Sequence, residues 1–182
     1  YLLSGDTATV WCFRGLHHAI VIFASAWDNY KEILGTADTN KKHSVPVKKF
    51  NETLTTQIKN MIKDGGAKRK YILVGRPSPT KTSGYDCVAG NYLGGLKYLD
   101  LCKATDKRES VDINEVIKKE LLTNPNIYFA DVNNQLCSAD SCLNHNEHQA
   151  IYTDKAHLST YGASIAFNEI LNTIKIASSI NK

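Results

Sequence analysis

Ala19-Ile-Val-Ile-Phe-Ala-Ser25 is a continuous apolar run, rich in β-branched residues, near the start of this 182-residue chain. A strand that is covered on both faces needs apolar side chains on both of its sides, so its sequence does not alternate. The run therefore predicts a buried central strand in a sheet that is covered on both faces.

Two later stretches have the same character. Tyr71-Ile-Leu-Val-Gly75 predicts a second buried strand, and the prolines of Arg76-Pro77-Ser78-Pro79 force an extended exit from it. Asn126-Ile-Tyr-Phe-Ala-Asp131 follows Asn124-Pro125 and predicts a third strand.

Amphipathic segments separate these predicted strands. From Pro46, apolar residues recur at spacings of three or four until Gly65-Gly66 ends the helix. Asp112 and Glu115 form a capping box that begins a second helix. The inward face predicted for a last helix consists of Ala163, Ala166, Phe167, Ile170, Leu171 and Ile174. Alternating strands and helices predict an α/β fold of three layers, a mostly parallel sheet with helices on both faces.

The segment from Thr80 to Arg108 lacks a clear period and contains several glycines, which predicts an irregular excursion. Cys87 and Cys102 could tie it with a disulfide. Cys12 is then left over, and an odd cysteine suggests a partner outside this chain. The connectivity does not follow from the sequence, and reduced, buried thiols are the alternative.

Cys137, Cys142, His145 and His148 lie close together in one polar loop. Four thiolate and imidazole ligands are what structural zinc takes, but zinc fingers usually bring ligand pairs from two separated elements. The crowding favours a disulfide between Cys137 and Cys142, with two exposed histidines, over a zinc site or free thiols. We expect no metal and no cofactor.

Composition sets broader limits. With 42% hydrophobic and 22% charged residues, the chain can bury one substantial core, which predicts a single domain over residues 1–182. The net charge is +4, yet the one run of three basic residues, Lys68-Arg69-Lys70, has no interleaved aromatics, so nucleic-acid binding is not predicted. No apolar run approaches the roughly 18 residues of a membrane span. Because the chain begins at Tyr1 without a signal-peptide pattern, we expect it to be part of a longer protein.

The stretch Asp154-Lys-Ala-His157-Leu-Ser-Thr-Tyr-Gly-Ala163 carries the predicted chemistry. It places a carboxylate three residues before an imidazole, on the loop that enters the last helix. An imidazole can take and give a proton near neutral pH, and a nearby carboxylate can orient its ring and stabilise the imidazolium. Asp154 and His157 are therefore the candidate catalytic residues. The alternative is that Asp154 caps a turn and His157 is an ordinary loop residue.

The string from Ile151 to Ala163 resembles the last motif block of the SGNH hydrolases, in which D-x-x-H supplies the acid and base of a Ser-His-Asp triad. Preceded by a pair of cysteines, D-x-x-H-L-S-x-x-G-A is similar to the SGNH domain fused to bacterial membrane O-acyltransferases, which acetylate O-antigen and other cell-surface glycans. The resemblance implies an SGNH/flavodoxin-like fold and an extracytoplasmic domain attached to a membrane protein. It also implies a glycan acceptor and an acyl donor as partners. Trp27 and Tyr30 match a W-x-x-Y pattern of those domains, or else close the end of the core.

The nucleophile is not located securely. SGNH enzymes carry it as the serine of a G-D-S block at the end of the first strand, and the comparable string here is Gly5-Asp6-Thr7. Threonine departs from that pattern, and the span from Thr7 to Ala19 is short for a helical crossover between parallel strands. We favour a nucleophile upstream of this chain over Thr7. The sheet should then be incomplete at its N-terminus, and this chain alone should be inactive.

The leading hypothesis is an O-acyltransferase that moves an acyl group, expected to be acetyl, to a cell-surface glycan. His157 would be the general base and Asp154 its orienting acid. Two alternatives remain: a stand-alone carbohydrate esterase that uses water as the acceptor, and a non-catalytic glycan-binding domain that lacks its nucleophile.

Overall fold

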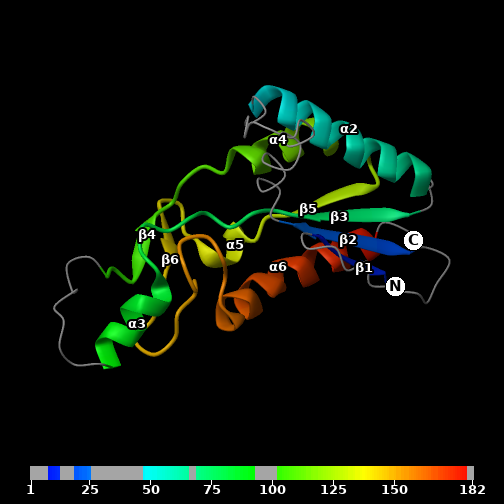
Figure 1. The fold of residues 1–182 in the computed structure, drawn as a ribbon. Coiled ribbons are helices and arrows are strands. Elements are labelled where there is room, and N and C mark those ends of the chain that lie inside the picture. The colour runs from blue at the N-terminus through cyan, green and yellow to red at the C-terminus, as the bar shows by residue number, and fades with distance from the viewer. Residues whose placement is uncertain (1–7, 13–18, 26–46, 66–68, 93–101, 180–182) are drawn as a thin grey trace. The chain divides into compact units, whose positions relative to one another are not determined.

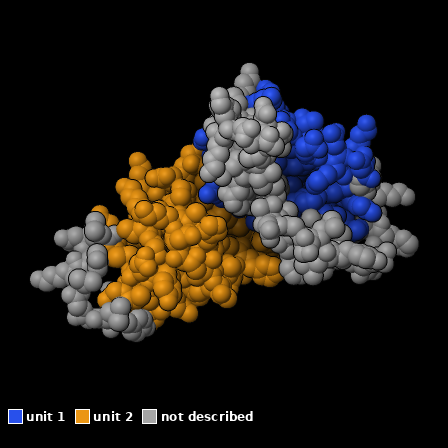
Figure 2. All heavy atoms as spheres, in the orientation of Figure 1, with its two compact units in different colours: residues 1–76, 112–130, 173–182 blue, residues 77–111, 131–172 orange. Residues whose placement is uncertain are grey.

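The computed structural model describes residues 8–12, 19–25, 47–65, 69–92 and 102–179 (Figure 1). The chain divides into two compact units, coloured separately in Figure 2. Unit 1 comprises residues 1–76, 112–130 and 173–182, and unit 2 comprises residues 77–111 and 131–172. The single domain expected from the composition stays a prediction.

Unit 1 contains a four-stranded sheet with the order β1-β2-β3-β5. Its strands are β1 (Ala8–Cys12), β2 (Ile20–Ser25), β3 (Lys70–Val74) and β5 (Ile127–Ala130). β2, β3 and β5 run parallel, whereas β1 pairs antiparallel with β2. The mostly parallel sheet and the inner position of β2 are therefore confirmed. β1 was not predicted, because its sequence shows no clear period.

Helices cover both faces of this sheet, as predicted. The side chains of β3 are all buried, and successive ones point to opposite faces. The Tyr71 hydroxyl donates to the carbonyl oxygen of Ile62 in α2 (Val47–Gly65), over 3.3 Å. The neighbouring Lys70 ammonium donates to the carbonyl oxygen of Ala177, near the end of α6 (Thr160–Ser179). α2 and the last turns of α6 therefore lie on opposite faces, and α4 (Asp112–Leu121) packs against α2 (Figure 1).

Unit 2 contains short elements. They are α3 (Gly84–Tyr92), β4 (Thr105–Lys107), α5 (Asn133–Leu136) and β6 (Ser141–Leu143), followed by the first turns of α6. β4 and β6 pair antiparallel. The Cys87–Cys102 disulfide ties α3 to the segment before β4, which is the pairing that the sequence left open.

The prediction that residues 80–108 are irregular was wrong in part, because α3 and β4 lie there. The helix has a local start signal that the glycines obscured. The Ser83 hydroxyl accepts the backbone N–H of Asp86 at 3.1 Å, which is the bond of an N-cap. A serine followed three residues later by an acidic residue could have located the start of α3.

The inward face predicted for α6 was also largely wrong. Phe167 is 50% exposed and Leu171 is 38% exposed. The buried positions of the helix are occupied by small residues, namely Gly162, Ala166, Thr173 and Ala177. Large apolar residues at helical spacing therefore indicated mainly the wrong face of α6. Of the residues predicted to face inward, Ala166 is the one that is buried.

The exit from β3 is fixed by a side chain of α4. Asn114 is buried, its Oδ1 accepts the backbone N–H of Arg76 at 2.8 Å, and its Nδ2 donates to the carbonyl oxygen of Arg76, also at 2.8 Å. Gly75 leaves room for this contact. A Cβ at that position would lie 2.6 Å from Cζ of Phe129 and 3.3 Å from Nδ2 of Asn114. The chain therefore leaves the carboxyl end of β3 in one defined direction.

We predict that Asn114→Ala lowers the free energy of unfolding by about 2 kcal/mol or more, because it leaves both peptide groups of Arg76 without these partners. Chemical denaturation of the purified chain measures the effect. Lys119→Ala is the matched control on the same helix and should change the value by less than about 0.5 kcal/mol, since Lys119 is exposed. Equal stability of the two variants would contradict this account of the β3 exit.

Candidate active site

Asp154 and His157 lie on a closed loop of unit 2. Tyr152 and Leu158 form an isolated antiparallel bridge at the base of the loop. Thr153 donates both its backbone N–H (2.9 Å) and its hydroxyl (3.1 Å) to the carbonyl oxygen of His157. Backbone pairing therefore holds the two ends of the loop together.

The structure brings the two predicted residues into direct contact. Oδ2 of Asp154 lies 2.7 Å from Nδ1 of His157. A carboxylate can only accept, so this geometry places a hydrogen on Nδ1. The second oxygen, Oδ1, accepts the backbone N–H groups of Ala156 and His157, each at 2.7 Å. One carboxylate thus shapes the loop and orients the ring.

These hydrogen bonds determine the ionisation of Asp154. The N–H of Ala156 contributes most, followed by the backbone and ring N–H groups of His157, and together they lower the pKa of the Asp154 carboxyl to about 2. Asp154 is consequently ionised at any pH at which an imidazole acts as a base. It can stabilise the imidazolium without taking the proton itself.

The other ring nitrogen of His157 is available for chemistry. The His157 side chain is 69% exposed, and within the described part of the chain Nε2 has no hydrogen-bond partner. Asp154 is 55% exposed. An accessible Nε2, backed by a carboxylate on Nδ1, is the arrangement of a general base.

Two further residues of the motif, to which the sequence analysis gave no role, begin α6. The Ser159 hydroxyl accepts the N–H of Gly162 at 3.0 Å, as an N-cap does, and donates to the carbonyl oxygen of Ala150 at 2.5 Å. Gly162 packs so closely that a Cβ there would overlap the carbonyl oxygen of Ile151. The L-S-x-x-G part of the motif therefore attaches the start of α6 to the segment before the loop.

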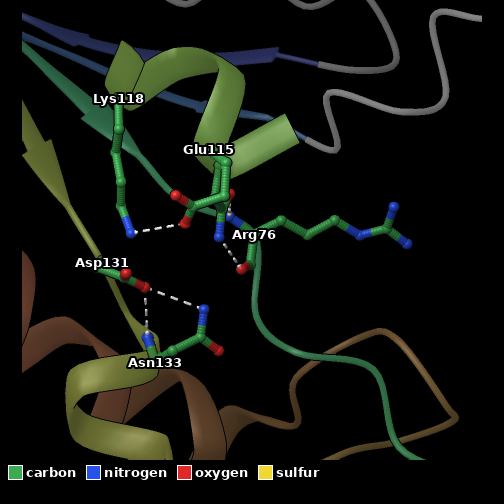
Figure 3. Close-up of polar contacts among 6 residues, drawn as sticks. Arg76, Glu115, Lys118, Asp131 and Asn133 are labelled. Atoms are coloured by element: carbon green, nitrogen blue, oxygen red, sulfur yellow. Dashed lines mark hydrogen bonds and ion pairs between the residues drawn. The ribbon is translucent and has the colours of Figure 1, made fainter. Parts of the chain in front are cut away.

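Asp131 and Asn133 at the carboxyl end of β5 have a structural role. The Asp131 carboxylate accepts the backbone N–H (3.2 Å) and the side-chain amide (3.0 Å) of Asn133, as Figure 3 shows. Asn133 Oδ1 in turn accepts the backbone N–H of Ser78 at 2.7 Å. Both side chains are buried. This pair was not predicted from the sequence. A polar residue directly after a buried strand is the signal that could have located it.

The predicted disulfide between Cys137 and Cys142 is confirmed. Paired sulfurs are not thiolates, so these two cysteines do not provide the zinc ligands of the alternative interpretation. His148 is exposed, as expected, but His145 is only 8% exposed, which contradicts the prediction of two exposed histidines. His145 is buried because it forms a bridge with Ala150, and its Nδ1 lies 3.0 Å from the carbonyl oxygen of Asn146.

The other predicted site residues fall outside the described ranges. Gly5-Asp6-Thr7 precedes β1, and Trp27 and Tyr30 follow β2. Cys12 is the last residue of β1, but its side chain is not described. Within the described ranges, no group of three His, Cys, Asp or Glu residues is placed to hold a metal ion.

The fold is α/β, and a loop of unit 2 carries an accessible carboxylate–imidazole pair. The model of the family described as "SGNH domain (fused to AT3 domains)" matches residues 13–172. The chain therefore belongs to this family of SGNH domains. The match begins after Gly5-Asp6-Thr7.

A solved structure has a similar fold, that of the lipopolysaccharide acetyltransferase periplasmic domain of Salmonella ser. Paratyphi A. The TM-score is 0.51 at 18% sequence identity, and the similarity covers 87% of this chain and 56% of that one. This chain thus spans just over half of the length of the acetyltransferase domain. No curated protein matches the chain.

We predict that the Asp154 carboxyl titrates near pH 2 in the folded chain. Because its folded pKa lies below the ordinary value of 3.8, ionised Asp154 stabilises the folded state above that value, and the contribution is lost as the pH falls through about 2. The carboxyl carbon shift in NMR follows the titration. His157→Ala should raise the midpoint only part of the way, since the N–H of Ala156 remains. A midpoint near 3.8 in the folded chain would contradict the hydrogen-bonded loop.

Proposed function

We propose that this chain supplies the SGNH domain of an extracytoplasmic O-acyltransferase. The enzyme transfers an acyl group, which we propose is acetyl, to a hydroxyl of a cell-surface glycan. The observation that carries the proposal is the Asp154–His157 pair, with its 2.7 Å hydrogen bond and its exposed Nε2. The family description, which names fusion to AT3 domains, and the acetyltransferase domain of similar fold support the same chemistry.

The pair would act as a proton carrier in two half-reactions. In the first, Nε2 of His157 takes the proton of a nucleophilic hydroxyl as its oxygen bonds to the acyl carbon, and the proton then passes to the departing group of the donor. In the second, Nε2 takes the proton of a glycan hydroxyl as that oxygen displaces the nucleophile, which recovers the proton. Asp154 stays ionised and stabilises the imidazolium in both half-reactions.

The proposal places the nucleophile outside the residues described above. Gly5-Asp6-Thr7 stands before a strand, because Ala8 begins β1, whereas the G-D-S block it resembles follows one. The antiparallel pairing of β1 with β2 also differs from the parallel first strand expected of such a block. These two points favour a serine elsewhere in the parent protein over Thr7.

The compartment and partners belong to the same proposal. Two disulfides, Cys87–Cys102 and Cys137–Cys142, persist best in an oxidising environment, which supports a location outside the cytoplasm. Among the described helices, none has the length and apolar character to cross a bilayer. A membrane acyltransferase domain in the parent chain would supply the acyl donor, and the glycan would be the acceptor.

In the parent protein, His157→Ala should lower the rate of glycan acetylation by roughly 10³-fold, because general-base catalysis is lost. Asp154→Asn should cost at least roughly 10²-fold, since an amide can favour the wrong histidine tautomer. Mass spectrometry of the glycan measures both. His148→Ala, at another exposed histidine, is the control and should be unaffected. Full activity of folded His157→Ala would refute the assignment. Acetate release without glycan acetylation would favour the esterase alternative.

The role of Thr7 is tested on the chain itself with p-nitrophenyl acetate. We expect the chain to release p-nitrophenol no faster than its Thr7→Ala and His157→Ala variants do, because the proposed nucleophile lies elsewhere in the parent protein. If Thr7 were the nucleophile, both variants would lose activity together, since a nucleophile and its base act as one unit. Turnover or an acyl-enzyme that disappears in both variants alike would contradict this and identify Thr7 as the nucleophile.

A further inference from the structure

The Asp154–His157 loop is exposed, so burial contributes little to holding it in one shape. Its support comes from hydrogen bonds at its base, and the largest fully buried side chain of the chain's described part, Tyr152, lies there. Tyr152 precedes Asp154 by two residues and forms the bridge with Leu158. Its carbonyl oxygen also accepts the backbone N–H of Tyr85 at 3.0 Å.

The hydroxyl of Tyr152 reaches a second segment of unit 2, residues 78–80. It donates to the carbonyl oxygen of Ser78 at 2.8 Å. Burial raises the pKa of this phenol, and the nearby charge of Asp106 raises it further, so the hydroxyl remains a donor at physiological pH. Two residues beyond Ser78, the backbone N–H of Thr80 donates to the carbonyl oxygen of Lys155, inside the loop, at 2.9 Å.

Ser78 is itself held on its other sides. Its backbone N–H donates to Oδ1 of Asn133 at 2.7 Å, its hydroxyl donates to the carbonyl oxygen of Glu109 at 3.2 Å, and that hydroxyl accepts the N–H of Glu109 at 3.0 Å. Ser78 is fully buried. The carbonyl oxygen that receives the Tyr152 hydroxyl is therefore a fixed point rather than part of a free loop.

We propose that Tyr152 is a positioning residue for the catalytic pair. Its hydroxyl fixes the distance between segment 78–80 and the loop. At that distance the backbone N–H of Thr80 donates to the carbonyl oxygen of Lys155, and the Asp154 carboxylate accepts the Nδ1–H of His157. This inference rests on the proposed function only in its consequence for catalysis. The geometric part concerns this chain alone and can be measured without activity.

The test compares Tyr152→Phe with Tyr71→Phe in the purified chain. Each variant removes one buried hydroxyl that donates to a carbonyl oxygen, but the partner of Tyr71 is Ile62 in unit 1. At a pH where His157 is neutral, ring ¹⁵N shifts report the share of the Nδ1–H tautomer, and hydrogen exchange reports the Thr80 amide. In Tyr152→Phe the Nδ1–H share should fall at least twofold, and Thr80 should exchange at least tenfold faster. Tyr71→Phe should leave both unchanged.

Unchanged tautomer and exchange in folded Tyr152→Phe would overturn the proposal, and so would equal changes in the two variants. If Tyr152→Phe does not fold, exchange in the unaltered chain decides: a Thr80 amide as unprotected as one in an unfolded peptide would overturn the proposal, and strong protection would support it. In the parent protein, Tyr152→Phe should lower kcat about tenfold with KM unchanged. Full activity of His157→Ala would refute the proposed function. The tautomer share measured in Tyr152→Phe would still decide whether Tyr152 positions the pair.

Discussion

The candidate site depends on a single carboxylate that accepts three N–H groups. Asp154 binds the backbone N–H groups of Ala156 and His157 with one oxygen and the ring of His157 with the other. The same hydrogen bonds that fold the loop also keep the carboxyl ionised. The shape of the loop, the charge of Asp154 and the orientation of the His157 ring therefore depend on one another. The D-x-x-H spacing lets the one carboxylate accept all three N–H groups.

The surroundings of the loop explain why its flanking residues are of particular types. The N-cap Ser159 and the close approach of Gly162 attach α6 on one side, and the Tyr152 hydroxyl reaches the fixed carbonyl of Ser78 on the other. Ser159 and Tyr152 supply hydrogen-bonding groups, and Gly162 leaves the space in which a Cβ would overlap the carbonyl oxygen of Ile151. The exposed loop is thereby supported at its base by buried groups, and the outer nitrogen of His157 stays accessible.

The sequence predicted those features that depend on neighbouring residues. Apolar runs located β2, β3 and β5, capping located α4, and an i, i+3 spacing identified Asp154 and His157. Features that depend on contacts between distant residues were missed. The inward face of α6 follows from close packing of small residues. The burial of His145 was missed although its bridge to Ala150 is local, because no pattern in that polar loop predicts the pairing. The role of Ser78 follows from bonds to Glu109 and Asn133, 31 and 55 positions away, which no local pattern reveals.

If His157 acts as a general base through its exposed ring, a small molecule with the same chemistry should restore activity to a variant that lacks the side chain. Imidazole added to the His157→Ala variant of the parent protein can occupy the accessible position beside Asp154 and take the proton in place of the missing side chain. Glycan acetylation should recover in proportion to the concentration of neutral imidazole, and Asp154→Asn in the same variant should abolish this recovery. A folded His157→Ala variant that imidazole fails to reactivate would contradict general-base catalysis by His157.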